Sequence, residues 1–370
     1  MSKEKTFEDE LISDLSASFS KKDSTASIDY VINSSSHVKN WIQTGYYPLD
    51  VVLSNNEHGG FPCGRLTEIS GQEAAGKTLL ASYIMANTQK NGGVAIYIDT
   101  EHTVTLDVLK ATGVDVEKLI HIQVGTVEEV FKAMETIVDK ITKKSAGKQI
   151  TIVWDSVAGS SSEAEIEGDY GQATIAMKAR LIGQGLRKYI PICSVYNVCL
   201  VFINQLRTNI GAIYGDKYIT TGGKAIPFHA SIQLRVVAVK SLKDNTTKDT
   251  IGRQIKIEVK KNKVAPPGRT VYYNINWGSK PGAWIDLPSS YWETGIMSGI
   301  LKKVTTQSYE FTYPSTGETL KLTKASFKNM MDEPTFVEEF KKAIAKRYII
   351  TSESLSDDVN WEVEDYNEED

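Results

Sequence analysis

Short apolar runs alternate with amphipathic stretches through the middle of the chain. Six runs have the residue types of β-strands, and they lie at residues 66–70, 94–98, 150–154, 198–203, 232–239 and 255–259. Apolar residues recur at helical spacing in stretches between them, at 78–90, 127–142 and 174–189. Such alternation is typical of a mostly parallel sheet covered on both faces. The pattern therefore predicts an α/β core over residues 45–280.

The N-terminal region carries one apolar stripe. Phe7, Leu11, Leu15 and Phe19 recur every fourth residue, which predicts a short helix, and residues 28–32 predict a strand after it. An isolated helix of this length is marginal in water. The stripe therefore needs a partner, either the chain's own core or a neighbouring subunit. From its position and this need, residues 1–44 are expected to form an oligomerisation element.

The alternation ends near Pro281 and Gly282. Beyond them, residues 309–322 predict a β-hairpin, and residues 333–345 predict a helix. The end of that helix carries Lys341, Lys342 and Lys346, as suits the negative end of a helix dipole. Residues 281–350 therefore predict a small α+β domain.

The composition is that of a soluble globular protein, with 41% hydrophobic and 24% charged residues. No apolar run approaches the roughly 18 residues of a membrane span, and the first ten residues show no secretory signal. The three cysteines are scattered, which fits a reducing cytoplasm. They form no CxxC pair, and the histidines form no metal-spaced cluster, so no structural zinc is expected.

Charge is distributed unevenly along the chain. Residues 351–370 hold nine acids and no Lys or Arg, and are expected to be a disordered tail. Taking these nine charges from the net charge of −4 leaves residues 1–350 at +5. A basic body with an acidic tail suggests a polyanion partner with which the tail competes. A tail that only aids solubility explains the same charges.

One segment matches the phosphate-binding pattern G-x-x-x-x-G-K-[ST]. It consists of Gly71, Gln72, Glu73, Ala74, Ala75, Gly76, Lys77 and Thr78. The segment follows a predicted strand and opens a predicted helix, which is the context that the pattern requires. Backbone N–H groups and the helix dipole favour phosphate there. Lys77 is expected to reach the β- and γ-phosphates of ATP, and Thr78 to coordinate Mg²⁺.

Two further predicted strands end in acids. Asp155 follows the run 150–154, where a fold of this type places the carboxylate that holds Mg²⁺ through water. Glu101 follows the run 94–98, where a carboxylate can orient the attacking water. A solvated acid at the end of a strand is the alternative for each. The match at 71–78 favours the functional interpretation of Asp155.

Several motifs in order resemble the RecA-type recombinases. They include GQEAAGKT, DTEH, WDSVA, FINQLR, TTGGKA and KKNKVAPP, and the resemblance covers roughly residues 40–350. It implies a P-loop ATPase core with a small C-terminal domain. The poor match at the N-terminus and the divergent C-terminus favour a phage-encoded, UvsX-like member.

The resemblance implies roles for five catalytic residues. Glu101 matches the family's water-activating glutamate, and Lys77 is the phosphate lysine. Gln205 matches the glutamine that senses the γ-phosphate and links it to a DNA loop. Lys261 and Lys263 match a basic pair that reaches the ATP held by the adjacent subunit. Ordinary strand-end polar residues are the alternative for Gln205 and the lysine pair.

Two segments resemble the family's DNA-binding loops. The first, at 167–175, leads into a helix, and the second, at 207–224, mixes glycines and threonines with apolar side chains. Exposed apolar groups in such a loop are costly unless they meet a ligand. Backbone N–H groups and arginine can hold phosphates while apolar and aromatic groups contact bases. The expected DNA-binding residues are Gly168, Ile175, Arg180, Arg207, Asn209, Ile210, Gly211, Tyr214, Gly222 and Gly223. A surface loop that folds back on the core is the alternative for the second segment.

Two positions depart from the family pattern. Val108 stands where the family has a tyrosine that stacks on adenine, which makes selectivity for adenine less secure. Pro227 precedes Phe228 where the family usually has lysine, which weakens one expected contact between subunits.

The sequence thus predicts an ATP- and Mg²⁺-dependent recombinase that forms helical filaments on single-stranded DNA and catalyses strand exchange. The expected partners also include duplex DNA, captured by the C-terminal domain, and mediator and single-strand-binding proteins. The expected location is the cytoplasm, or the cytoplasm of a bacterial host if a phage encodes the chain. One alternative is a hexameric helicase of the same ATPase fold. Another is a nucleotide-gated single-strand-binding scaffold with feeble hydrolysis.

Overall fold

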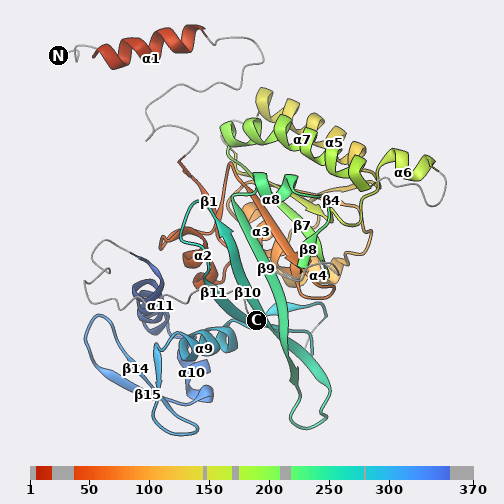
Figure 1. Ribbon diagram of the computed structural model, residues 1–370. Coiled ribbons are helices and arrows are strands. Elements are labelled where there is room, and N and C mark those ends of the chain that lie inside the picture. The colour runs from red at the N-terminus through yellow and green to blue at the C-terminus, as the bar shows by residue number, and fades with distance from the viewer. Residues whose placement is uncertain are drawn as a thin grey trace, which may run out of the picture.

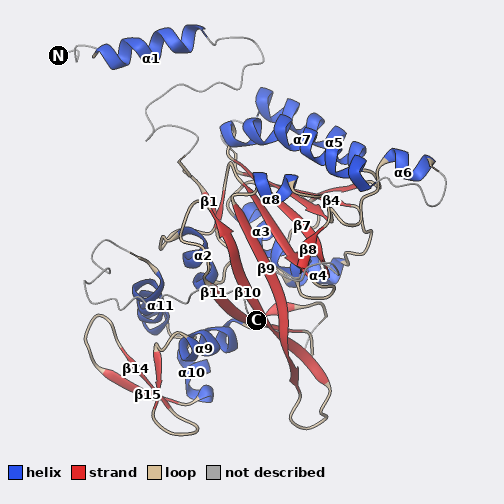
Figure 2. Cartoon of the chain, viewed as in Figure 1, coloured by secondary structure: helices blue, strands red, loops and turns tan. Residues whose placement is uncertain are grey.

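The computed structural model describes residues 6–18, 37–144, 148–168, 175–208, 218–278 and 281–350. Within these residues the chain forms an N-terminal helix, an α/β core and a small C-terminal unit (Figure 1). Figure 2 shows the strands of the core side by side with helices on both faces. The predicted α/β fold class is confirmed.

Ten strands of the described residues form one sheet, in the order β12–β11–β10–β9–β3–β7–β6–β4–β5, with β8 paired to β7. The strands from β9 to β5 in this order are parallel neighbours, which confirms the predicted parallel sheet. The bounds are β3 (Leu66–Gly71), β4 (Val94–Asp99), β5 (Ile120–Gln123), β6 (Ile150–Asp155), β7 (Val198–Thr208), β8 (Tyr218–Thr220), β9 (Ile232–Lys243), β10 (Thr250–Asn262), β11 (Thr270–Asn276) and β12 (Trp284–Ile285).

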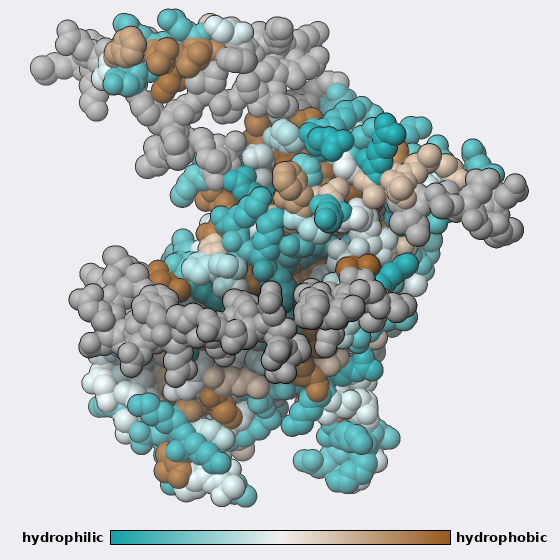
Figure 3. Space-filling model, viewed as in Figure 1, coloured by the Kyte–Doolittle hydropathy of each residue, from teal (hydrophilic) through white to brown (hydrophobic). Residues whose placement is uncertain are grey.

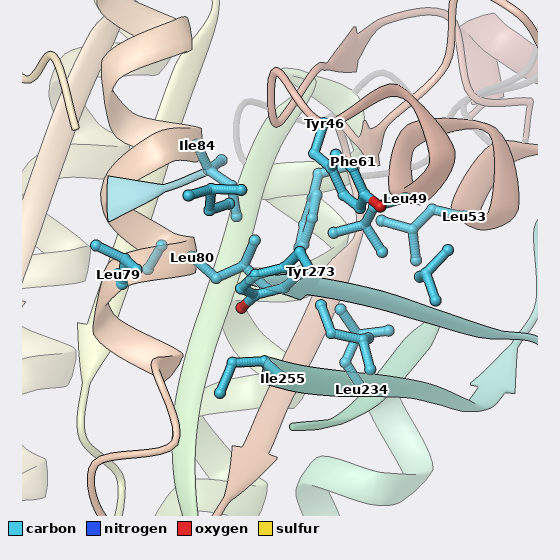
Figure 4. Packing of buried hydrophobic residues seen from close by; sticks show 14 of the residues in the cluster. Tyr46, Leu49, Leu53, Phe61, Leu79, Leu80, Ile84, Leu234, Ile255 and Tyr273 are labelled. Carbon is cyan, nitrogen blue, oxygen red and sulfur yellow. The ribbon is translucent and has the colours of Figure 1, made fainter. Parts of the chain in front are cut away.

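Helices cover the sheet over two apolar cores. The helix bounds are α2 (Tyr47–Ser54), α3 (Lys77–Lys90), α4 (Leu106–Ala111), α5 (Val127–Lys144), α6 (Glu163–Glu167), α7 (Ile175–Val195) and α8 (Ala225–His229). One core lies under α3 and α2, where Leu79, Leu80 and Ile84 pack near Leu49 and Leu53 (Figure 4). The other lies under α5 and α7 and is built around the larger side chains of β6 and β7. A separate pair, β1 (Trp41–Ile42) and β2 (Phe61–Pro62), lies beside α2.

Beyond β9 the alternation of strands with helices ends. β9 turns directly into β10, and β10, β11 and β12 pair antiparallel. The predicted runs 232–239 and 255–259 are therefore the two arms of a long hairpin (Figure 1). The sequence suggested an α/β pattern here because both runs are apolar on the face toward the first core.

The C-terminal unit has its own small sheet. β13 (Leu301–Lys303), β14 (Tyr309–Thr312) and β15 (Thr319–Leu322) pair antiparallel, which confirms the predicted hairpin. The helices are α9 (Leu287–Met297), α10 (Lys324–Met330) and α11 (Pro334–Tyr348). Phe311, Phe327, Phe336 and Phe340 are fully buried among these elements. The proposed domain limits stay predictions, since β12 still pairs with the main sheet at residues 284–285.

The predicted N-terminal helix is present as α1 (Phe7–Ser18), and none of its residues is buried. Phe7 is 74% exposed, and Leu11 and Leu15 are 46% and 40% exposed. Figure 3 shows brown, apolar patches on the surface of α1. Phe19, the predicted strand at 28–32 and the acidic tail lie outside the described residues. Among the described helices, none has both the length and the apolar character that a membrane crossing needs.

Candidate nucleotide and DNA sites

The phosphate-binding segment connects the end of β3 to the start of α3 through a tight turn. A side chain at Gly71 would place its Cβ 2.5 Å from the carbonyl oxygen of Val236 on the neighbouring strand. Gly76 has a φ of 90° and directly precedes the first residue of α3. Glycine at these two positions therefore lets the backbone turn beside β9 and present its N–H groups ahead of the helix.

Lys77 is a buried cation at the start of α3. Its Nζ donates to the carbonyl oxygens of Gly71, at 3.1 Å, and Gln72, at 2.7 Å. Burial lowers the pKa of Lys77, and the nearby carboxylates of Asp155, Glu101 and Glu73 oppose that shift. The ammonium group thus lies within the turn, among the acids at the ends of the parallel strands.

Thr78 and Asp155 form a pair of oxygen donors beside Lys77. The Thr78 hydroxyl donates to Asp155 Oδ2 at 2.6 Å, and the Tyr97 hydroxyl donates to the same oxygen at 2.9 Å. Burial raises the pKa of Asp155 to about 6, against the lowering effect of these two hydrogen bonds. A hydroxyl and a carboxylate in this arrangement are ligands suited to Mg²⁺.

Glu101 lies at the next strand end, after β4. Its Oε1 accepts hydrogen bonds from the Ser156 hydroxyl and, at 3.2 Å, from Gln205 Nε2. Asp99 holds the turn, because its Oδ1 accepts from the backbone N–H of Glu101 at 3.1 Å. The structure therefore brings together four predicted side chains, Lys77, Asp155, Glu101 and Gln205, from three parallel strands and α3.

Lys261 and Lys263 lie near the end of β10 and away from this turn. Lys261 pairs with Gln233 on β9, and Gln233 pairs with Glu68 on β3, three residues before Gly71. That offset is about 10 Å along the strand, and β3 is two strands away from β10. Lys261 Nζ donates to the carbonyl oxygens of Pro227 at 2.5 Å and Phe228 at 3.3 Å. Lys263 is exposed.

Comparison with known proteins gives the family. A family model described as the RecA N-terminal domain matches residues 11–280. Protein RecA of Nostoc punctiforme is 37% identical over 309 residues, which cover 83% of this chain and 80% of that protein. The chain belongs to the RecA family. Protein RecA of Frankia alni is 36% identical over 322 residues, 86% of each chain, and Protein RecA of Chelativorans sp. is 39% identical over 265 residues, 71% of this chain and 69% of that one.

Membership of the RecA family defines the activity. The chain is an ATP-dependent DNA recombinase and a DNA-dependent ATPase that acts in recombination and repair. It binds nucleotide and DNA and forms filaments. A helicase or a scaffold without turnover is not favoured. Its affiliation with phage UvsX-like members stays a prediction, since the relatives named above are bacterial RecA proteins.

The two expected DNA loops are described only at their ends. Gly168 caps α6, Arg180 is exposed on α7, and Ile175 is the first residue of α7. Arg207 is exposed on β7, opposite Ile219 of β8. The other expected residues, Asn209, Ile210, Gly211 and Tyr214, lie outside the described residues.

Gly222 and Gly223 differ in their surroundings. Gly222 is buried, with a φ of 95°, and a Cβ there would lie 3.0 Å from Ile182 of α7. Gly223 is exposed, with a φ of 68°. A Cβ at Gly223 would likewise lie 3.0 Å from Ala179 of α7, so both glycines let the loop end approach α7, and Gly223 is exposed as well.

A groove runs beside the base of the second loop. It has a volume of about 380 Å³, and its walls come from the β7–β8 hairpin, the start of α8 and the polar face of β9 and β10. Three cations line it, Lys224, Arg235 and Lys260, and its lining residues include no acid. Arg235 lies 5.4 Å from the ring centre of Tyr218. Cations next to an exposed aromatic residue are typical of surfaces that bind single strands.

The two departures from the family pattern lie in different environments. Val108 is half-buried on α4 and packs against the first core, so its side chain is occupied by the fold. Pro227 lines the basic groove, next to Phe228, which is 73% exposed.

Several residues at the site had no clear signal in the sequence. Tyr97 lies inside an apolar strand and resembles a core residue, although its hydroxyl reaches Asp155. Arg253 donates to the carbonyl oxygen of Ala74 at 3.1 Å and lies 5.9 Å from the Trp277 ring centre. The sequence separates Arg253 from Ala74 by far more than a local motif, so only the fold could bring them together. Ser156, by contrast, directly follows Asp155, and that adjacency is a signal from which it could have been found.

Proposed function

We propose that this chain hydrolyses ATP at the interface between neighbouring protomers of a helical filament on single-stranded DNA, and that the nucleotide state sets the grip on DNA during homologous pairing. The observation that supports this most directly is the contact of 3.2 Å between Gln205 and Glu101. Gln205 begins the segment that leads into the second DNA loop, and Glu101 lies beside the phosphate-binding turn. One hydrogen bond therefore joins the hydrolytic site to the start of a DNA-binding loop.

The phosphate-binding turn is proposed to hold the triphosphate. The backbone N–H groups of residues 71–76 and the dipole of α3 favour negative charge there. Lys77 adds a buried positive charge, and displacement of its hydrogen bonds to Gly71 and Gln72 would free Nζ for phosphate oxygens. Thr78 and Asp155 fit Mg²⁺, the latter through water, and bound Mg²⁺ would neutralise charge on the β- and γ-phosphates.

Glu101 is proposed to act on the attacking water. A carboxylate can accept a proton from water or orient it, and its efficiency depends on fixed geometry. Ser156 and Gln205 both donate to Oε1 and fix that oxygen. The second oxygen, Oε2, is then the one to face the water. Binding of a phosphate by Gln205 would break its hydrogen bond to Glu101, which links the two events.

Lys261 and Lys263 are proposed to complete the site of the adjacent protomer. The two lysines lie two strands away from β3 and do not extend to the level of Gly71 along the sheet. They therefore cannot reach the phosphate-binding turn of their own chain. Cations that enter a nucleotide site from a neighbour stabilise charge in the transition state. Burial and the nearby Lys263 lower the pKa of Lys261, and Glu68 opposes that shift. Hydrolysis would then depend on assembly of the filament.

Filament assembly is proposed to use α1. An apolar groove of about 350 Å³ lies between α5 and the edge of the sheet at β4 and β5, and Ile137 and Ile141 line it. Lys140 and Lys148 flank this groove, whereas the first turn of α1 is acidic. Apolar and charge complementarity therefore favour docking of α1 from one protomer in the groove of the next.

The α1 contact can be tested with a single exposed residue. Leu11→Asp should raise the protein concentration needed for filaments on single-stranded DNA by about tenfold or more, because burial of a leucine contributes about 1.5–3 kcal/mol. Ser13→Asp adds the same charge to α1 away from the stripe and should leave that concentration unchanged. Electron microscopy over a protein titration gives both values. Equal effects of the two variants would argue against docking through the stripe.

DNA binding is proposed to use the two loops and the basic groove. The single strand would be held by residues of both loops, namely Gly168, Ile175, Arg180, Arg207, Asn209, Ile210, Gly211, Tyr214 and Gly223. Gly222 would hold the loop end in place. Lys224, Arg235 and Lys260 would extend this contact to further phosphates. The basic end of α11 is proposed to capture duplex DNA, and the acidic tail to restrain that capture. Mediator and single-strand-binding proteins are proposed as further partners, and the cytoplasm as the location.

One experiment tests the proposed function as a whole. ATP hydrolysis is measured with and without single-stranded DNA, and the same samples are imaged by electron microscopy. We expect DNA to stimulate turnover and the images to show helical filaments. Closed rings with processive unwinding would favour the helicase, and DNA binding without strand exchange would favour the scaffold.

A further inference from the structure

A carboxylate that the proposed mechanism does not use is buried in β3. Glu68 is 1% exposed, and each of its oxygens accepts a hydrogen bond from an amide side chain. Asn204 Nδ2 donates to Oε1 at 2.9 Å, and Gln233 Nε2 donates to Oε2 at 2.7 Å. A buried carboxylate is costly without such partners. Glu68 therefore needs both amides, and it fixes how each amide is oriented.

Asn204 uses all of its hydrogen-bonding groups in one arrangement. Besides Glu68, Nδ2 donates to the carbonyl oxygen of Thr221 at 2.8 Å. Its Oδ1 accepts from the backbone N–H of Gln205 at 3.0 Å. A side-chain amide has two N–H donors, so Nδ2 is fully used by these two acceptors.

These hydrogen bonds matter because of where Asn204 lies relative to the second DNA loop. Asn204 and Gln205 precede the second DNA loop at 207–224, and Thr221 lies near the far end of that loop. Asn204 therefore ties the two ends of the loop together and holds the backbone of Gln205. The Gln205 side chain then contacts Glu101. A continuous series of hydrogen bonds joins Gln233, Glu68, Asn204, Gln205 and Glu101, with the loop end attached at Asn204.

We propose that Glu68 and Asn204 are positioning residues that couple DNA binding to ATP hydrolysis. Movement of the loop end at Thr221 changes the hydrogen bonds available to Asn204, and Asn204 passes the change to Gln205. Glu68 keeps Asn204 in the orientation that can make this contact. Networks that are fully hydrogen-bonded in a protein interior favour one arrangement, and loss of one member disturbs the rest. The proposal rests on the proposed roles of Gln205 and Glu101.

The test replaces the carboxylate by its amide. Glu68→Gln removes the negative charge that orients both amides and leaves one acceptor and one donor at residue 68, so Asn204 keeps an acceptor only if Gln233 reverses its amide. The ratio of ATP turnover with single-stranded DNA to turnover without it is expected to fall by about tenfold, the effect of one misplaced hydrogen bond in a buried site. Glu258→Gln is the matched control, because Glu258 lies on β10 in a part-exposed ion pair with Lys256 at 2.6 Å and should keep the ratio.

A reciprocal exchange distinguishes coupling from a general defect. In the double variant Glu68→Gln and Gln233→Glu, residue 68 can accept from Asn204 and donate to residue 233, so the hydrogen-bond pattern is restored. The ratio should return to within about twofold of the wild-type value. Thermal unfolding of each variant is measured alongside turnover.

Three results would overturn the inference. They are a normal ratio in Glu68→Gln, a fall of both turnover rates by the same factor with a lower melting temperature, and a double variant that folds but keeps the low ratio. Absence of DNA stimulation in the wild-type chain would instead refute the proposed function. If Glu68→Gln does not fold, the double variant alone decides, since the inference requires it to fold and to respond to DNA.

Discussion

Replacement of Lys77 by alanine is expected to abolish nucleotide-dependent filaments and to lower DNA-stimulated turnover by about 10²-fold or more, the usual cost of removing one preorganised charged donor. Lys77 is the buried cation at the phosphate turn, and the carboxylates of Asp155 and Glu101 lie close to it. Without its charge the site would be dominated by acids, which disfavours a triphosphate. Hydrolysis assays and electron microscopy with ATP and single-stranded DNA measure both effects.

Lys90→Ala is the matched control for Lys77→Ala. Lys90 ends the same helix in an exposed position, and its loss should change neither filaments nor turnover. Normal filaments in Lys77→Ala would contradict the assignment of the phosphate-binding turn.

Mixing of two inactive variants tests whether the site is shared between protomers. Lys77→Ala protomers keep Lys261 and Lys263, whereas protomers with Lys261→Ala and Lys263→Ala keep an intact turn. Although Lys77→Ala alone is expected to form no filament, the intact turns of the second variant allow a mixed filament, in which some interfaces combine the intact turn of one protomer with the intact lysines of the other. Turnover should therefore reappear on mixing, although each variant alone is inactive. No recovery in filaments that contain both variants would place the lysines outside the neighbour's site.

The sequence predicts the backbone around residues 71–78 well because the pattern is local. Gly71 and Gly76 lie within one short turn, and the predicted strand and helix on either side agree with β3 and α3. Asp155 and Glu101 could be added because the carboxyl ends of neighbouring parallel strands meet at one edge of the sheet. The positions of these elements can therefore be predicted from apolar runs and one local turn, without knowledge of contacts between distant residues.

Other features depend on contacts between distant parts of the chain. β9 and β10 form an antiparallel hairpin, and the apolar pattern of two strands does not show whether a helix connects them. Glu68 resembles a solvent-facing residue in a strand, and only the neighbouring strands bring Asn204 and Gln233 to it. The basic groove likewise combines Lys224, Arg235 and Lys260 from three elements.

Replacement of Glu101 by glutamine should separate binding from hydrolysis. The introduced amide keeps an oxygen that can accept from Ser156 and Gln205, so the local structure should persist. It loses the negative charge and the basicity that act on water. We expect ATP and DNA to bind with affinities close to wild type, while turnover falls by about 10²-fold or more. Filaments formed with ATP should consequently dissociate more slowly.

Nucleotide binding, DNA binding and single-turnover hydrolysis are measured on the Glu101→Gln variant and on Glu117→Gln, which removes an exposed carboxylate after α4. The second variant should match wild type in all three. Wild-type turnover in Glu101→Gln would remove Glu101 from the mechanism, and a lost affinity for ATP would assign it to binding instead. Retained binding with lost turnover would show that Gln205 still exchanges its contact with residue 101 for the phosphate, so that the response of the DNA loop to bound ATP persists when hydrolysis does not.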